Sequence, residues 1–461
     1  MIDNDVLAGL LGSHLVRQRW FAGREDDVPS CKVVTLETLV EGPPVLLRAL
    51  VETVFGGEQA LGGGTALGGE AGQGGEPALY QLVIGVRPAG GHEEFLSGRP
   101  EAVIAMDVAT EMGPSLVYDA TADPELTVAL VNEVFPGTDA ERGRLVSTES
   151  THTSVVFDER LIMKLFRQIG AGGRNPDAEI TRALTRVGFA NVATPVAEWR
   201  DGVNDYALVS EFLVGGADGF SLALTSLRDL YDCRCDPEEA GGDFAPDARR
   251  LGAVTARLHL ALAEAFPAVR ADASHWAAVM EERFAQASLA GIDPALVHAV
   301  FDRLRSVSRA GMAIRSHGDY HLGQVMRTDT GWFVLDFEGE PGSSSEERLD
   351  LSSPLRDAAG MIRSFHYVAQ VALRERAEAI DERIVSLSAA WERRSRYAFL
   401  EGYLGVEGIG ALLPPGELDQ DVVFTAFELD KAIYEVGYEQ AHRPDWVGIP
   451  LAAVARIVGS V

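Results

Sequence analysis

Short apolar segments in the first half of the chain predict β-strands. Val45–Val54 and Ala78–Val86 form a first pair, and Thr153–Asp158 and Leu161–Phe166 form a second pair joined by a tight Glu-Arg turn. Between the first two, Gly56–Gly75 is dominated by glycine. That composition predicts a flexible loop, and its glycines show no phosphate-loop pattern ending in Lys-Ser/Thr.

Helix signals accompany and follow these strands. Asp123 and Asn175 each stand directly before a proline, which is typical of the first turn of a helix. A further strand pair ends in Ala207–Phe212. After it, the apolar positions recur with the helical period, as in Leu251–His259 and near Trp391. Strands followed by helices predict an α+β protein.

The same order of segments predicts three parts. We expect a small N-terminal cap subdomain over residues 1–100, a strand-rich lobe over 101–212 and a mostly helical lobe over 213–461. The length is sufficient for a two-lobed protein with such an extension.

The formal net charge of −29 excludes some classes of partner. Nucleic acids and anionic membranes bind clusters of Lys and Arg, so we expect neither as a partner. No apolar run reaches the length of a membrane span, and the N-terminus lacks the pattern of a secretory signal. The expected location is the cytoplasm.

The chain has three cysteines, Cys31, Cys233 and Cys235. The last two are too closely spaced for a zinc knuckle, and there is no second pair. We expect no disulfide framework, with Cys233 and Cys235 as plain thiols in a loop.

The segment His317–Gln324, with Trp332–Glu340 after it, carries the strongest chemical signal. It places Asp319 on a short loop, the amide of Gln324 five residues later, and carboxylates at the end of a second strand. Phosphoryl transfer needs these groups, because one carboxylate receives the proton of the acceptor hydroxyl while oxygen ligands hold Mg²⁺ against the phosphates of ATP. We expect Asp319 to be the catalytic base.

Other residues of this segment have less specific expectations. His317 is expected to brace the backbone, whereas His321 either contacts the substrate or packs. Asp336 and Glu338 are expected on one face of the same strand, as metal ligands together with Gln324. For Glu338 an ion pair with a nearby arginine is the alternative.

Nucleotide-binding candidates lie earlier in the chain. Lys164 stands inside an apolar strand, where an unpaired ammonium is costly, and Glu179 on the following helix is its expected partner. Three further groups are expected to contact ATP. The first two are the hydroxyls and the backbone N–H groups of a loop that takes the place of a glycine-rich loop, at Ser150, Thr153 and Ser154. The third is a hinge beside adenine, at Val209, Glu211 and Phe212.

A C-terminal segment is the best indication of the acceptor. Lys431, Tyr434, Glu435, Tyr438 and Glu439 have the spacing of one helix face. Aromatic rings stack on the apolar side of a sugar while charged groups bond its hydroxyls, so this face suits a sugar. A solvated face with internal ion pairs is the alternative.

Together these motifs resemble the aminoglycoside-phosphotransferase branch of the protein-kinase-like fold, and within it the actinobacterial maltokinases. The resemblance extends from Glu149 to Ile449 and includes Ser353–Ser364 and Glu428–Glu439, and Gln18–Phe21 is similar to the N-terminal cap of that family. It implies a bilobal kinase fold and ATP-dependent phosphorylation of maltose to maltose 1-phosphate, which feeds α-glucan and glycogen synthesis. It also implies association with enzymes of the trehalose and maltose pathway.

Two alternatives remain open at this point. The first is a related sugar kinase, especially a glucosamine kinase forming glucosamine 6-phosphate, because Tyr320 and His366 depart from the maltokinase pattern. The second is a pseudokinase that binds nucleotide without turnover. It is disfavoured because each residue that the chemistry requires is present.

Overall fold

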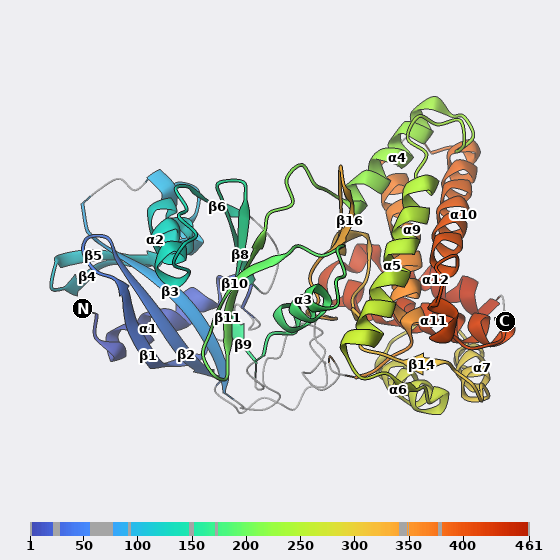
Figure 1. Ribbon diagram of the computed structural model, residues 1–461, viewed down its shortest axis with the longest axis horizontal. Helices are drawn as coiled ribbons and strands as arrows, with labels where there is room; N and C mark the ends of the chain where they lie inside the picture. Colours follow the sequence, from blue (N-terminus) through green and yellow to red (C-terminus); the bar gives the residue numbers. More distant parts are fainter. Residues whose placement is uncertain are drawn as a thin grey trace. The chain divides into compact units, whose positions relative to one another are not determined.

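The computed structural model describes residues 2–21, 28–55, 77–90, 94–146, 152–170, 174–340, 348, 350–376 and 380–459 (Figure 1). The described residues form two compact units. The N-terminal unit contains those of Met1–Glu179 and Ala193–Val214, and the C-terminal unit contains those of Ile180–Val192, Gly215–Pro341 and Glu346–Val461. In the described part of the chain, no helix has both the length and the apolarity to cross a membrane.

The N-terminal unit begins with helix α1 (Asn4–Leu15) and an antiparallel sheet in the order β1–β2–β3–β5–β4. Its strands are β1 (Ser30–Val40), β2 (Val45–Val54), β3 (Ala78–Pro88), β4 (Val103–Thr110) and β5 (Gly113–Asp119), with β9 (Gln168–Ile169) beside β3. Leu7, Leu11 and Leu15 of α1 pack into the same apolar core as residues of this sheet. The expected end of the cap at residue 100 needs correction, because β4 and β5 complete this sheet by pairing with one another and with β3.

A second antiparallel sheet has the order β10–β11–β8–β7–β6. Its strands are β6 (Gly143–Val146), β7 (His152–Phe157), β8 (Leu161–Phe166), β10 (Pro195–Arg200) and β11 (Asp205–Glu211). Helices α2 (Pro124–Val134) and α3 (Pro176–Arg186) begin where the prolines predict, and the Asp123 side chain accepts from two N–H groups of the first turn of α2. The predicted strands of both sheets are confirmed.

The C-terminal unit is mostly helical, as expected. Its helices are α4 (Gly219–Cys233), α5 (Ala245–Ala265), α6 (Ala273–Gln286), α7 (Pro294–Arg305), α9 (Pro354–Glu375), α10 (Glu382–Leu404), α11 (Glu417–His442) and α12 (Gly448–Gly459). The short strands β12 (Ala217–Asp218), β15 (Val325–Thr328) and β16 (Gly331–Val334) form one small sheet, and β13 (Val269–Arg270) and β14 (Met312–Ala313) pair with each other.

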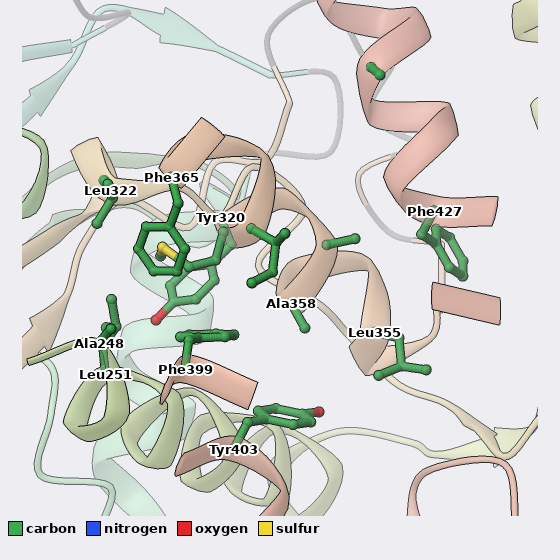
Figure 2. Close-up of a cluster of buried hydrophobic side chains, with 14 of the residues drawn as sticks. Ala248, Leu251, Tyr320, Leu322, Leu355, Ala358, Phe365, Phe399, Tyr403 and Phe427 are labelled. Atoms are coloured by element: carbon green, nitrogen blue, oxygen red, sulfur yellow. The ribbon is translucent and has the colours of Figure 1, made fainter. Parts of the chain in front are cut away.

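Helices α5 and α10 cross at two glycines. A Cβ atom on Gly252 would lie 2.0 Å from the carbonyl oxygen of Phe399, and one on Gly402 would lie 2.0 Å from that of Arg249. Only glycine allows backbones to approach so closely. The crossing brings Phe399 into an apolar cluster with Tyr320 and Phe365 (Figure 2).

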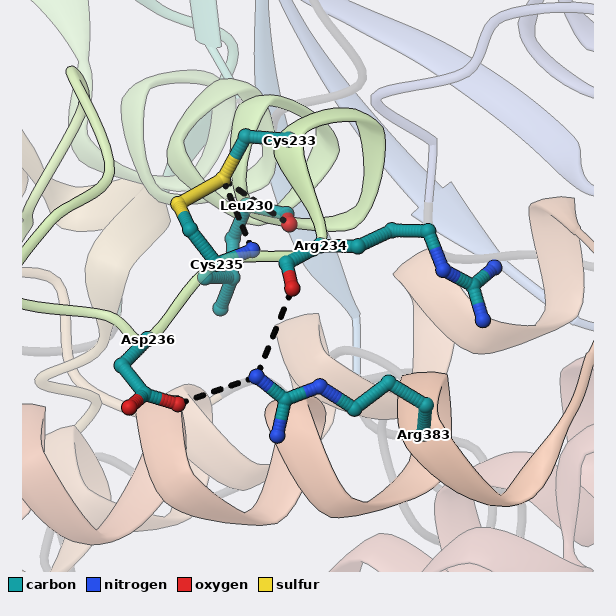
Figure 3. The surroundings of a disulfide bond; sticks show 6 residues. All are labelled: Leu230, Cys233, Arg234, Cys235, Asp236 and Arg383. Carbon is teal, nitrogen blue, oxygen red and sulfur yellow. Dashed lines mark hydrogen bonds and ion pairs between the residues drawn. A yellow bond between two sulfur atoms is a disulfide. The ribbon is translucent and has the colours of Figure 1, made fainter.

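The structure contradicts the expectation of plain thiols, because Cys233 and Cys235 form a disulfide (Figure 3). Cys233 ends α4, and Arg234 then takes a left-handed conformation with φ of 54°. That turn brings the two Cα atoms to 5.2 Å from each other, within the range of a disulfide. Spacing alone did not reveal it, because the pairing depends on how the helix ends.

Candidate active site

The loop that carries Asp319 is fixed by a buried carboxylate on α9. Asp357 accepts hydrogen bonds from the backbone N–H groups of His317 (2.8 Å) and Gly318 (3.1 Å). Its Oδ2 also lies 3.2 Å from Nε2 of His259. Burial by itself would raise the pKa of Asp357, but the hydrogen bond and charge of His259 outweigh it, so the pKa is lowered. Asp357 is not among the site residues that the sequence predicts.

His317 joins the loop to the segment containing Asp336. Its Nε2 lies 2.9 Å from the carbonyl oxygen of Leu335, and its ring packs against Phe337 with 4.9 Å between centroids. Because the side chain is buried and bonded to backbone, its expected structural role is confirmed.

Asp319 lies against a lysine from α11. One carboxylate oxygen is 2.9 Å from Nζ of Lys431, and the other is 3.5 Å from Nε2 of His321. Nδ1 of His321 accepts from the N–H of Gly323, so the neutral ring carries its proton on Nε2, toward Asp319. Lys431 also contacts Glu340 at 2.7 Å.

These contacts decide the charge of Asp319. Burial would raise the pKa of Asp319, but the positive charge of Lys431 and the contact with His321 lower it far below the ordinary value. Burial would likewise lower the pKa of Lys431, whereas Asp319 and Glu340 raise it. The pair is therefore ionised at neutral pH.

The expected metal ligands lie close together. Nε2 of Gln324 donates to Oδ2 of Asp336 at 3.2 Å, and carboxylate oxygens of Asp336 and Glu338 lie within 4.8 Å of each other. An amide and two carboxylates form an oxygen donor set that suits Mg²⁺. Asp336 has a φ of +61°, a strained conformation that is typical of functional sites. One detail is corrected. Because β16 ends at Val334, Asp336 and Glu338 lie after the strand and do not share a strand face.

Aromatic rings line α11 beyond Lys431. Nζ of Lys431 lies 4.5 Å from the ring centroid of Tyr434. The rings of Tyr434 and Tyr438 stack at 6.4 Å, and those of Tyr438 and His442 stack at 4.4 Å. We call Tyr434, Tyr438 and His442 the aromatic row. It starts at the loop that carries Asp319 and continues away from it along one helix face.

The two glutamates of this face already have cationic partners. Glu435 binds Arg363 of α9 at 2.5 Å, and Glu439 binds Arg443 at 2.8 Å and accepts from the hydroxyl of Tyr367. Of the internal ion pairs that were the alternative for this helix face, Glu439–Arg443 is present, whereas Glu435 pairs with another helix.

The two residues that depart from the maltokinase pattern, Tyr320 and His366, have partners inside the C-terminal unit. Tyr320 points into the apolar cluster, where its hydroxyl lies 2.9 Å from Oγ1 of Thr255 (Figure 2). His366 is buried, and its Nδ1 lies 3.1 Å from Oε2 of Glu392 on α10.

The nucleotide candidates belong to the N-terminal unit. Lys164 of β8 binds Asp177 of α3 at 2.7 Å, a carboxylate that the sequence analysis did not identify. The role of Glu179, two residues later, stays a prediction. Ser154 is buried opposite Lys164, and Ser150 lies outside the described residues.

Three other expectations in this unit stay predictions, and the structure gives the present partners of the residues concerned. Thr153 accepts from Nε of Arg167 at 2.8 Å, so its hydroxyl is bonded inside the unit. The N–H groups of Glu211 and Phe212 donate to the carbonyls of Thr194 and Arg160, and their expected contact with adenine stays a prediction. Val209 is buried within β11.

Comparison with known proteins supplies the family. The maltokinase N-terminal cap domain matches residues 14–123, and the phosphotransferase enzyme family matches residues 233–397. A glucosamine kinase of Streptacidiphilus jiangxiensis is 30% identical over 341 residues, which cover 70% of this chain and 75% of that protein. The chain belongs to this family of sugar kinases.

A further relative and two solved structures are also similar to this chain. A glucosamine kinase of Mycolicibacterium smegmatis (strain ATCC 700084 / mc(2)155) is 27% identical over 332 residues, covering 68% of this chain and 79% of that protein. The solved structure of a glucosamine kinase in crystal form B has a TM-score of 0.68 at 21% identity, with 100% of both chains covered. Another, in complex with glucosamine, ADP and inorganic phosphate, has a TM-score of 0.64 at 21% identity and 99% coverage of both chains. The α+β kinase-like fold with an N-terminal cap is confirmed.

For this sugar kinase, replacement of Lys431 is expected to change the pH dependence. Without the cation, burial dominates and the pKa of Asp319 rises, so in Lys431→Met the acid limb of kcat/KM moves to higher pH. Lys431→Arg keeps a cation and is the matched control. The measurement is kcat/KM from pH 4 to 9. An acid limb at the same pH in both variants would contradict the role of Lys431.

Proposed function

We propose that this sugar kinase transfers the γ-phosphoryl group of ATP to the anomeric hydroxyl of maltose, giving maltose 1-phosphate. The observation that carries the proposal is the aromatic row, which starts where Lys431 contacts Asp319. From Tyr434 to His442 it extends for two helical turns, about 12 Å at 1.5 Å per residue. Such a length suits two sugar rings in line, with the reacting ring at Asp319.

Asp319 would act as the base. In the transfer the acceptor oxygen forms a bond to the γ-phosphorus, the bond from that phosphorus to the β,γ-bridging oxygen breaks, and the hydroxyl proton passes to Asp319. The anomeric hydroxyl is the most acidic of the sugar, so one ionised carboxylate is sufficient. Asp357 contributes by holding the loop at two backbone N–H groups.

Gln324, Asp336 and Glu338 would hold Mg²⁺, which when bound neutralises charge on the phosphates. Lys164 would bind phosphate oxygens of ATP, with Asp177 holding its ammonium in place. Both roles follow from the chemistry of the residues.

Glucosamine is the second candidate acceptor. Two relatives that match this chain over more than two thirds of its length are named glucosamine kinases. At 30% and 27% identity they support phosphorylation of a sugar more strongly than the choice of one sugar.

The direct test measures ATP consumption with Mg²⁺ against maltose, glucosamine, glucose and no sugar, with the phosphate position read by NMR. We expect turnover on maltose with an anomeric phosphate. Asp319→Asn is expected to keep ATP binding and to lose a factor of about 10² to 10⁴ in kcat, as loss of a positioned base does. Preference for glucosamine with phosphate at another carbon would replace the maltose proposal, and retained activity of Asp319→Asn would exclude it as the base.

A second prediction concerns the aromatic row. Tyr438→Ala removes the ring one helical turn beyond Tyr434, so it should raise KM for maltose about tenfold, as one lost stacking contact does, and change KM for glucose by less than twofold. Tyr438→Phe keeps the ring and is the control. Equal effects on both sugars would mean that the row does not bind a second ring.

A further inference from the structure

We call the side of α11 that carries Lys431, Tyr434, Glu435, Tyr438 and Glu439 the acceptor face. The negative charges of the carboxylates around it are balanced by cations. Asp319 and Glu340 share Lys431, and Asp430 contacts Arg283 at 2.8 Å. The other pairs complete a balanced set of five carboxylates and five cations. The set consists of Asp319, Glu340, Asp430, Glu435 and Glu439 with Lys431, Arg283, Arg356, Arg363 and Arg443.

Arg363 is the most buried cation of this set. Its side chain is 1% exposed, whereas that of its partner Glu435 is 16% exposed. Both Nε and NH2 of Arg363 donate to the Glu435 carboxylate. A buried guanidinium requires such a counter-charge, so the ion pair neutralises the negative charge of Glu435.

Neighbouring carboxylates have partners of their own. Glu428 binds Arg396 at 2.8 Å and Arg456 at 2.9 Å, and Glu392 lies beside His366. Because these carboxylates have their own partners, the ion pair between Glu435 and Arg363 is kept.

An ammonium group gains little from carboxylates that are already neutralised, and it is repelled by the cations behind them. We infer that the acceptor site selects an uncharged sugar, and that Arg363 is the residue that sets this preference by neutralising Glu435. The inference rests on the proposed function, because it concerns the sugar site of the same kinase. The aromatic row gives the place of the sugar, and the ion pairs give the charge that the sugar meets there.

The unmodified enzyme provides the first test. Glucosamine and glucose differ by an amine in place of one hydroxyl, and an amine of this kind titrates near pH 7.7–8, roughly as an α-amino group does. We expect kcat/KM for glucosamine, divided by that for glucose at the same pH, to rise about tenfold between pH 7 and 9 as the amine becomes neutral. The division removes the titration of the enzyme's own groups.

The second test exchanges the cation. Arg363→Met keeps an apolar stem and frees Glu435, so the glucosamine-to-glucose ratio at pH 7 should rise at least about tenfold, as one uncompensated charge contact allows. Arg363→Lys keeps the charge and should keep the wild-type ratio. The double variant Arg363→Met/Glu435→Gln restores neutrality and should return to that ratio.

Three results would overturn the inference. The first is a wild-type enzyme that prefers glucosamine to glucose at pH 7 with a ratio of kcat/KM values that does not change with pH. The second is a glucosamine-to-glucose ratio that is the same in Arg363→Met as in the wild-type enzyme. In both cases the sugar kinase activity stands. Absence of turnover with every sugar would instead reject the proposed function, and the inference with it.

Discussion

The site depends on one buried carboxylate, Asp357, in the first turn of α9. The helix starts beside the catalytic loop because Ile314 and Ser352 exchange two backbone hydrogen bonds, of 2.8 and 2.9 Å, just before the Ser353 cap. Asp357 then accepts from two successive N–H groups of the loop. Gly318, between His317 and Asp319, has a φ of +88°, which glycine adopts readily. The position of Asp319 is therefore set by tertiary structure more than by the loop itself.

The second organising feature is charge balance on α11. Lys431 keeps Asp319 ionised although the carboxylate is buried, and the aromatic row begins at the same lysine. One helix therefore sets the charge of Asp319 and also presents the rings that would bind the sugar. The carboxylates on this face are neutralised by cations. Under our inference, this neutralisation gives the site its preference for uncharged acceptors.

Much of this organisation follows from local sequence. The strand and helix predictions hold because apolar period and proline caps act over a few residues. Gln324 and Asp336, which form a hydrogen bond, are separated by 12 positions in the sequence. The decisive pairs are more distant, with separations of 112 residues for Lys431 and Asp319, 72 for Arg363 and Glu435, and 40 for Asp357 and His317. Local pattern contains no information on such pairs. For the same reason the inward direction of Tyr320 was missed, because it depends on α5.

The most direct measurement on this account is kcat for Asp357→Asn, together with hydrogen exchange at the amides of His317 and Gly318. Asparagine offers one acceptor oxygen in place of two, so one of the two N–H groups loses its partner. We expect faster exchange at these amides and a kcat lower by about 100-fold, the cost of a slightly misplaced base, with KM for ATP unchanged. Unchanged kcat with freely exchanging amides would contradict the claim that Asp357 positions the catalytic loop.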